Sequence, residues 1–454
     1  MKLQEAFDVA RGETVAFIGA GGKTSLLVGL GYELVEAGWR VLATTTTRIG
    51  EDQLELLPYA LTYDRGAAAI SDALSEHQFV FLYDEIRNGK VYGPPPEWVP
   101  GLLDAVDSDV LLVEADGARG LPFKAPFEHE PVIPAQTSLV IPVASLAVLG
   151  QPLDEAHVYN PAAMTDCFGF FPGSRVKSPW LAQVMRHEQL GLRGVPDEAR
   201  VVAFLNQTPA QGYLRGRARL IARLILRSSR FQGVALGSIR GAEAIHEIQR
   251  PVGAIVLAAG LSTRMGQSKV LMPWSGNKAI VEHIVEQLIR SRVDHIVVVT
   301  GHEANRVKQL VKPLGAKVVY NRSYKTGEML SSLKIGLHAL PDHVTGALVV
   351  LGDQPRIQPR VVYQVLMAYA EGKGDIVAPR FQSRRGHPIL IDRRYWSEIW
   401  SLPRGSAPRD VIDSYQDRMA YVAVNTDSVL NDVDTPQDYQ NERQQAGLGR
   451  RDPD

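Results

Sequence analysis

Short runs of apolar residues along this 454-residue chain alternate with longer segments in which apolar residues recur three and four positions apart. The short runs predict buried β-strands, and the longer periodic segments predict amphipathic helices. Two segments begin in the same way, with an apolar strand, a glycine turn and a helix, one at Thr14 and the other at Gly253. This repetition indicates two domains of one class.

The second half alternates between the two kinds of segment. A stripe of Ile280, Ile284 and Leu288 predicts one face of a helix, and the β-branched run at 295–300 predicts the next strand. Such alternation is typical of a mostly parallel sheet in a three-layer α/β fold, whose ligands bind at the carboxyl ends of the strands. We expect further helices at 303–311, 329–340 and 359–369, and further strands at 317–320, 347–351 and 375–378.

The first half repeats this style, so a second three-layer α/β domain is expected there. Its predicted strands are 14–18, 40–43, 79–82, 110–113, 139–143 and 201–205, and its predicted helices are 24–36 and 214–227. The second of these helices carries several arginines, which we interpret as a solvated face rather than a docking surface for an acidic partner. These arginines are Arg215, Arg217, Arg219, Arg223 and Arg227.

Between residues 240 and 251 the apolar periodicity is lost and the chain then meets Pro251, which favours a domain junction here. We therefore expect a first domain at 1–248 and a second at 249–442. Residues 443–454 are polar and are predicted to form a disordered tail.

Composition and charge exclude several classes of protein. The 49 basic and 50 acidic residues nearly cancel, so neither nucleic acid nor a membrane surface is an expected partner. Cys167 is the only cysteine, which excludes an intrachain disulfide and a cysteine-rich metal site. The early residues lack a signal-peptide pattern, and the apolar stretch 139–149 is too short to cross a bilayer. A cytoplasmic protein is expected.

The stretch LAAGLSTRMGQSK, from Leu257 to Lys269, directly follows an apolar strand. Backbone N–H groups of such a turn close around phosphate oxygens, while Arg264 and Lys269 add positive charge. We interpret the loop as a nucleoside triphosphate site built on Leu257, Ala258, Ala259, Gly260 and Gly266. The alternative is a pair of ordinary glycine turns with solvated cations. A dinucleotide fingerprint fits poorly, because Ser262 stands where its second glycine belongs.

From Gly253 to about Tyr439 the chain resembles the MocA-type molybdenum cofactor cytidylyltransferases, relatives of the guanylyl-transferring MobA enzymes. The resemblance implies a Rossmann-like nucleotidyltransferase domain. MobA-type proteins tend to carry LAGG where this chain has LAAG at 257–260, so CTP is implied over GTP. The matching segments are LAAGLSTRMGQSK, GEMLSSLKIGL at 327–337, GDQP at 352–355, GHP at 386–388 and NDVDTPQDY at 431–439.

Asp353 follows the predicted strand 347–351 and is our first ligand for Mg²⁺, which prefers carboxylate and phosphate oxygens. Asp432 and Asp434 are candidates for a second ligand, and the resemblance favours this motif without deciding between them. The structural alternatives are a turn-capping role for Asp353 and helix capping for the other pair. Catalysis is expected to rest on Arg264, Lys269 and Asp353 through positioning and electrostatics.

Four further residues of the second half are candidates for ligand contacts. Ser331, Ser332 and Lys334 open a predicted helix, where they would contact the base or ribose of the nucleotide, with a helix cap as the alternative. His387 lies in the GHP segment and is a candidate contact for the acceptor substrate, although a lone histidine is often structural.

In the first half, the loop GAGGKTS follows a strand and opens a helix, which favours phosphate binding by Gly19, Gly21, Gly22, Lys23 and Thr24. The loop is shorter than a Walker motif, and Thr24 replaces the third glycine of a dinucleotide fingerprint. Asp116 ends another strand as a Walker B aspartate does, so it is a candidate metal ligand. A glycine turn with a surface lysine is the alternative.

The segments GAGGKTS, TTTTRI and EADGARGLPFKAP resemble the YqeC-type selenium-dependent hydroxylase accessory proteins over roughly residues 10–240. The resemblance implies an accessory domain of a pathway more than a reaction, and the loop residues themselves favour a P-loop-like domain with ATP or GTP as candidate nucleotide. We therefore expect a maturation enzyme that transfers CMP from CTP to molybdopterin, with or without bound metal, and serves a molybdenum hydroxylase. The alternatives are a guanylyl- or sugar-phosphate nucleotidyltransferase and a non-catalytic cofactor carrier.

Overall fold

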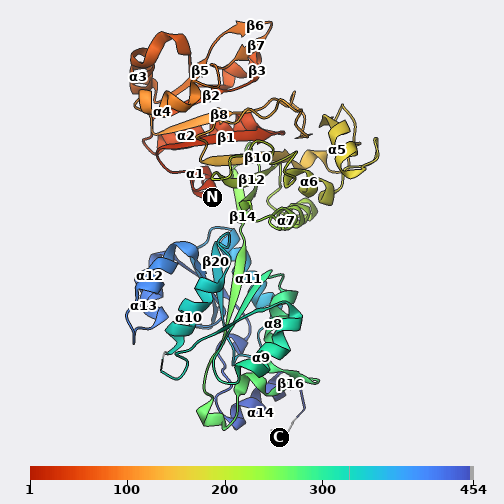
Figure 1. Cartoon of the computed structure of the whole chain (residues 1–454), viewed down its shortest axis with the longest axis vertical. Coiled ribbons are helices and arrows are strands. Elements are labelled where there is room, and N and C mark those ends of the chain that lie inside the picture. The colour runs from red at the N-terminus through yellow and green to blue at the C-terminus, as the bar shows by residue number, and fades with distance from the viewer. Residues whose placement is uncertain (327, 450–454) are drawn as a thin grey trace. The chain divides into compact units, whose positions relative to one another are not determined.

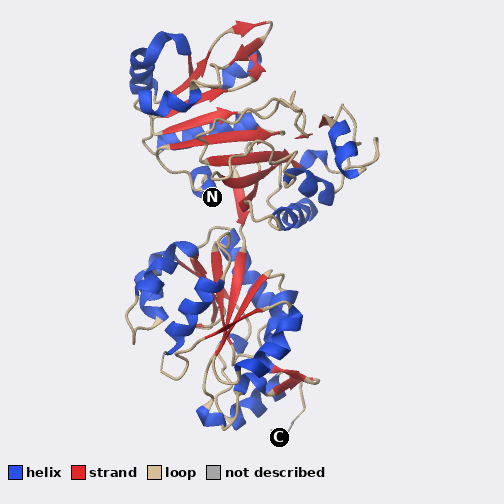
Figure 2. Cartoon of the chain, in the orientation of Figure 1, coloured by secondary structure: helices blue, strands red, loops and turns tan. Residues whose placement is uncertain are grey.

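The computed structural model describes residues 1–326 and 328–449, and it divides into two compact units, Met1–Gln249 and Arg250–Asp454 (Figure 1). Among the described residues, no helix combines the length and apolar character needed to span a bilayer. Each unit is built around one central sheet with helices on both faces (Figure 2). The expected α/β class is confirmed for both halves.

The sheet of the first unit has nine strands, of which all but the edge strand β14 run parallel to their neighbours. Apolar side chains alternate between its two faces, so Phe17 packs toward α2 while Ile18 points to the opposite side. In spatial order the strands are β14 (Ile245–Gln249), β13 (Phe231–Gly237), β12 (Arg200–Asn206), β10 (Leu139–Ser145), β1 (Glu13–Gly19), β8 (Val110–Glu114), β2 (Val41–Thr45), β5 (Phe79–Tyr83) and β4 (Tyr59–Thr62).

Helices cover both faces of this sheet, with α1 and α2 on one side and α3, α4, α6 and α7 on the other. Two small sheets flank it, β3 (Arg48–Gly50) with β7 (Lys90–Tyr92) and β6 (Ile86–Arg87), and β9 (Phe123–Lys124) with β11 (Val158–Tyr159). The helices are α1 (Leu3–Phe7), α2 (Lys23–Glu36), α3 (Gly66–His77), α4 (Leu102–Ala105), α5 (Pro161–Phe168), α6 (Ser178–Met185) and α7 (Tyr213–Ile225).

The second unit has an eight-stranded sheet in which β19, β18, β15 and β20 run parallel and β23 runs antiparallel to β20. Helices α8, α9 and α11 pack on one face, and α10, α12 and α13 pack on the other. The strands are β19 (Lys317–Tyr320), β18 (His295–Thr300), β15 (Val252–Ala258), β20 (Gly346–Leu351), β23 (Ile389–Asp392), β21 (Ile376–Phe381), β22 (Arg384–Arg385) and β24 (Met419–Ala423).

A short hairpin of β16 (Pro273–Ser275) and β17 (Lys278–Ala279) precedes the helices of this unit. The helices are α8 (Ile280–Arg290), α9 (Ala304–Val311), α10 (Glu328–Ala339), α11 (Pro359–Ala370), α12 (Trp396–Ser401), α13 (Pro408–Ser414) and α14 (Pro436–Gln445). Residue 443, where a disordered tail is expected to begin, lies in α14, and the Arg443 side chain is buried and donates to the carbonyl oxygen of Trp274. Residues 450–454 of the expected tail lie outside the described residues.

The segment before Pro251, in which we predicted a domain junction, contains the edge strand β14, which pairs antiparallel with β13 up to Gln249. One expectation about this region is wrong. The arginines of α7 are not simply solvated, because Arg215 and Arg219 both donate to Glu247 of β14, whose side chain is fully buried. A buried carboxylate needs such partners, so the strand and the helix depend on each other.

Candidate functional site

The first candidate site lies where the neighbouring parallel strands β15 and β20 end. Leu257 pairs with Leu351, and the N–H of Gly352 donates to the carbonyl oxygen of Leu257 at 3.0 Å. A Cβ atom on Gly352 would lie 2.5 Å from that oxygen, so only glycine allows this approach. The close contact brings the loop after β15 beside Asp353.

The loop after β15 folds back on itself through two short 3₁₀ turns, Thr263–Met265 and Lys269–Leu271. Its ends are tied by a hydrogen bond of 3.0 Å from the N–H of Lys269 to Oγ of Ser262. Ala258 and Ala259 are buried, whereas Cβ positions at Gly260 and Gly266 meet no other atom within 4 Å. The two glycines therefore border open space, as a phosphate-binding loop requires.

Four charged side chains meet above these strand ends. Nζ of Lys269 donates to Asp434 and lies 3.5 Å from Oδ2 of Asp353. Nη1 of Arg264 lies 2.9 Å from the other oxygen of Asp434, although 69% of the Arg264 side chain is exposed. The structure thus places the loop cations and both aspartates in one cluster.

Asp432 lies beside this cluster, where its Oδ1 accepts a 2.8 Å hydrogen bond from Nε2 of Gln354. Burial, and next the charge of Asp432, raises the pKa of Asp353, while the charge of Lys269 opposes the rise. Asp434 behaves in the opposite way, because the hydrogen bond from Lys269 lowers its pKa. The carboxylate of Asp353 therefore has less compensating positive charge than that of Asp434.

The cluster fits a divalent cation. The described residues contain no group of three or more histidine, cysteine, aspartate or glutamate side chains that could hold a metal alone. Mg²⁺ commonly uses one or two protein carboxylates together with phosphate oxygens, and Asp353 and Asp434 supply such a pair. Capping of α14 is done by Thr435 with Asp438, so Asp432 and Asp434 are not needed for it.

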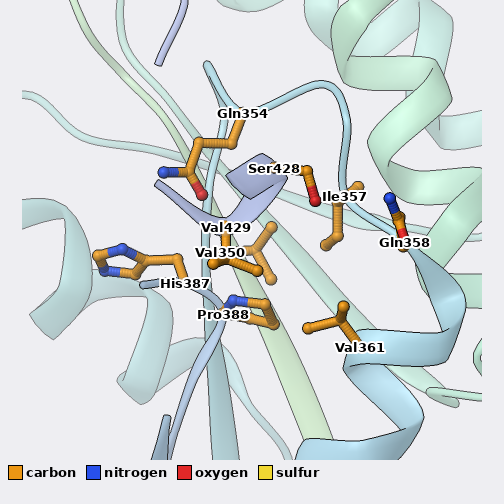
Figure 3. Close-up of a pocket in the computed structure, with 9 residues that line it drawn as sticks. All are labelled: Val350, Gln354, Ile357, Gln358, Val361, His387, Pro388, Ser428 and Val429. Atoms are coloured by element: carbon orange, nitrogen blue, oxygen red, sulfur yellow. The ribbon is translucent and has the colours of Figure 1, made fainter. Parts of the chain in front are cut away.

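His387 lines a small cavity of about 10 Å³ and, among the residues that the structure describes, forms no ion pair with the charged cluster. Figure 3 shows His387 and Gln354 on one side of this cavity and Gln358 and Val361 on the other. Burial, and next the charge of Arg385, lowers the pKa of His387 to about 4, so the ring is neutral at physiological pH. Gln354 connects the cavity to the charged cluster, because it lines the cavity and its amide donates to Asp432.

The remaining candidates of the second unit lie on α10. Nδ2 of Asn321 donates to Oγ of Ser331 at 2.8 Å and to Oγ of Ser332 at 3.0 Å. Nζ of Lys334 donates to the carbonyl oxygen of Leu402 at 2.6 Å, so this lysine does not join the loop cations. Gly327 of the same segment lies outside the described residues. Asn321, which sequence reasoning missed, follows directly after β19.

The second candidate site is the loop between β1 and α2 in the first unit. Gly19, Gly21 and Gly22 all have positive φ, at 92°, 85° and 130°. A Cβ atom would lie 2.3 Å from the Val143 carbonyl oxygen at Gly19 and 2.3 Å from Nδ2 of Asn206 at Gly22. The glycines are therefore required by the backbone path and by close neighbours.

Lys23 is buried among carboxylates at the start of α2. Its Nζ lies 3.1 Å from Oδ1 of Asp116 and 3.7 Å from Oε1 of Glu114, and only 4% of the side chain is exposed. Burial would lower the pKa of Lys23, but the charges of Asp116 and Glu114 raise it. Thr24 donates to Glu114 at 2.8 Å, so the candidate nucleotide residues Lys23, Thr24 and Asp116 lie together.

Sequence reasoning missed the other members of this buried network. Nζ of Lys124 lies 3.1 Å from Asp116 and 3.1 Å from Glu130, and 2% of the Lys124 side chain is exposed. The segment EADGARGLPFKAP contains both Asp116 and Lys124, but their pairing depends on the fold. Beside the network is an open cleft of 1290 Å³, lined by the glycine loop and by residues that follow strands β2, β8, β10, β12 and β13.

Comparisons with known proteins match each unit separately, and they confirm both resemblances. The family model described as YqeC protein matches residues 15–162, and the MobA-like NTP transferase domain matches residues 254–419. The YqeC protein of Escherichia coli (strain K12) is 36% identical over 199 residues, which cover 43% of this chain and 77% of that protein.

Two further comparisons concern the second unit. The molybdenum cofactor cytidylyltransferase of Escherichia coli (strain K12) is 24% identical over 192 residues, which cover 41% of this chain and 93% of that protein. Among solved structures, Rv0371c from Mycobacterium tuberculosis H37Rv has 25% identity and a TM-score of 0.39, covering 43% of this chain and 97% of that one.

Proposed function

This chain belongs to the YqeC family and carries a MobA-like NTP transferase domain, and we propose that this domain transfers CMP from CTP to the terminal phosphate of molybdopterin. Pyrophosphate is the second product. The similarity to a molybdenum cofactor cytidylyltransferase over 93% of that protein supports CTP and molybdopterin as substrates.

The observation that carries this proposal is the meeting of Arg264, Lys269, Asp353 and Asp434 at the ends of β15 and β20. Arg264 is exposed and presents a fork of donors to the β- and γ-phosphates, while Lys269 acts as a point charge near the α-phosphate. Asp353 and Asp434 would hold Mg²⁺, which neutralises charge on the triphosphate when it is bound.

The acceptor needs little help from a protein base. A phosphate monoester has a second pKa near 6 and is largely ionised at neutral pH. The protein therefore contributes position and charge, because the transferred group must stay in line with the acceptor oxygen. His387 is neutral and lies beside a cavity next to Gln354, so we assign it a supporting role at the acceptor side.

For the first unit we propose an ATP- or GTP-binding accessory domain that acts on loading of a molybdenum hydroxylase. Gly19, Gly21 and Gly22 would enclose the phosphates, with Lys23 and Thr24 beside them and Asp116 as a metal ligand. Covalent fusion of the two units raises the effective concentration of one product near the next site.

The test is a reaction of the purified chain with Mg²⁺, molybdopterin and either CTP or GTP. We expect pyrophosphate and the cytosine dinucleotide with CTP, and far less product with GTP. Preference for GTP would assign the chain to guanylyl transfer. Absence of pyrophosphate with both nucleotides, while molybdopterin still binds, would favour the cofactor carrier.

A further inference from the structure

We infer that the cleft of the first unit binds a second ligand beside the nucleotide, a phosphate monoester carried by a planar heterocycle. The inference rests on the proposed nucleotide site at Gly19–Thr24 and adds a subsite on its far side. That subsite consists of Arg48, Arg119 and Tyr159, which all line the cleft.

The cleft has room for two ligands. Its volume of 1290 Å³ exceeds the range of roughly 300–1,000 Å³ that is typical for one small molecule. Its lining includes the glycine loop and Thr24, and also Arg48, Arg119, His129 and Tyr159 from other segments of the chain. With a nucleotide on the loop, the remaining volume is available to this second group of residues.

Two arginines give this second part its charge. Arg48 and Arg119 are both exposed, and neither forms an ion pair with a carboxylate among the residues that the structure describes. They come from different elements that approach closely, because a Cβ atom on Gly117 would lie 3.9 Å from the carbonyl oxygen of Arg48. Paired guanidinium groups match the geometry and charge of a phosphate dianion.

Aromatic side chains beside the arginines offer a surface for a flat ring. Cζ of Arg119 lies 5.5 Å from the ring centroid of Tyr159. Tyr159 and His129 line the cleft, and Phe127, which lies outside its lining, packs edge to face on Tyr159 at 5.3 Å and parallel to His129 at 6.0 Å. Aromatic and guanidinium planes together favour stacking of a heterocycle.

A buried chain of contacts connects the subsite to the glycine loop. The N–H of Gly19 donates to Oδ2 of Asp116 at 2.9 Å, and the same oxygen lies 3.1 Å from Nζ of Lys124. That Nζ lies 4.8 Å from the ring centroid of Tyr159. Asp116 and Lys124 therefore link the glycine loop to the ring of Tyr159 through buried contacts.

This arrangement identifies the ligand class by chemistry. The buried network beside the cleft holds three carboxylates, Glu114, Asp116 and Glu130, and two lysines, Lys23 and Lys124, so one negative charge stands against the two exposed arginines. A ligand must supply negative charge to the arginines and a flat apolar surface to Tyr159. A phosphorylated pterin has both features, as does the acceptor proposed for the second unit.

The test uses the full chain and flavin mononucleotide, a phosphate monoester on a fused heterocycle whose fluorescence reports binding. We expect saturable binding that persists with saturating ATP and Mg²⁺. The double variant Arg48→Ala with Arg119→Ala is expected to weaken this binding by about tenfold or more, since two charge-assisted contacts are lost. Arg65→Ala, an exposed arginine of the same unit outside the cleft, is the matched control and is expected to bind as the wild type does.

Riboflavin, which lacks the phosphate, is expected to bind more weakly, and the double variant is expected to lower its affinity less than that of flavin mononucleotide. Wild-type flavin mononucleotide affinity in that variant, or displacement of the flavin by ATP, would overturn the inference. Parallel titration with fluorescent ATP separates the two claims. If the wild-type chain binds flavin mononucleotide but not ATP, the nucleotide site is refuted, and if it binds ATP but not flavin mononucleotide, the second subsite is refuted. If the double variant unfolds, Arg48→Lys with Arg119→Lys keeps the charge and is expected to give intermediate affinity.

Discussion

Replacing Asp353 with asparagine should separate activity from stability in the second unit. The change keeps the shape of the side chain and removes its charge, which we assign to holding a cation. Nζ of Lys269 lies 3.5 Å from Oδ2 of Asp353, and at an effective dielectric constant of about 20 this attraction is about 5 kcal/mol before desolvation. Loss of one such preorganised electrostatic group typically lowers kcat by about 10²–10³-fold.

The same variant should fold at least as well as the wild type. Folding raises the pKa of Asp353, so the folded state holds its proton more tightly than the unfolded state does. Stability from this group is therefore present at low pH and lost as pH rises above the ordinary value of 3.8. At pH 7 the ionised carboxylate costs stability, and the neutral amide removes that cost.

The assay measures pyrophosphate release with CTP and molybdopterin, together with thermal unfolding at pH 7. Asp417→Asn is the matched control, because 78% of that side chain is exposed and it lies outside the cluster. We expect normal turnover from the control. Near-normal turnover of Asp353→Asn would refute the cation role, and a clear drop in its Tm would refute the electrostatic argument.

Three other changes test separate parts of the structure. Arg264→Ala should lower CMP transfer by about 10–100-fold without a change in Tm, as measured by pyrophosphate release, because its exposed guanidinium is assigned to the phosphates. Gly22→Ala should destabilise the first unit by about 1–3 kcal/mol and weaken ATP binding, because φ of Gly22 is 130° and a Cβ atom would meet Asn206. The control Gly216→Ala should leave stability and ATP binding unchanged, because a Cβ atom there meets open space. His387→Asn should flatten the pH dependence of unfolding between about 4 and 6.5, because wild-type stability from the neutral ring is lost as pH falls through that range. Calorimetry from pH 4 to 7 measures how stability changes with pH. The same slope in the variant and the wild type would contradict this contribution of the neutral His387 ring.

Most of the architecture can be predicted from the periodicity of apolar residues, because long apolar runs must be buried in the core. The strand at His295–Thr300 is predicted to the residue, and the helix at Pro359–Ala370 differs by one residue at its end. The edge strand Ile245–Gln249 is missed because its alternating apolar positions are few and are interrupted by His246 and Glu247. Glu247 can be buried because Arg215 and Arg219 of α7 pair with it, and this pairing between distant segments cannot be predicted from the sequence.

The candidate sites are predictable where a motif spans one turn and unpredictable where partners come from distant segments. Arg264 and Lys269 lie in one loop, and the strand order brings Asp353 to them. The hydrogen bond from Lys269 to Asp434 cannot be predicted from the loop, because Asp434 lies more than 160 residues later in the chain. The direction of the Lys334 side chain does not follow from its place in the motif, because it turns to the Leu402 carbonyl oxygen instead of the site.

The pairing of β14 with β13 decides where the two units can be separated. Only Arg250 and Pro251 lie between the last strand of the first unit and the first strand of the second. A cut near residue 240, where the segment of lost apolar periodicity begins, would remove Glu247 from its arginines and strip the hydrogen-bonding edge of β13. An uncovered edge recruits strands from other molecules, so such a fragment would aggregate, whereas cleavage after Gln249 would preserve a capped sheet.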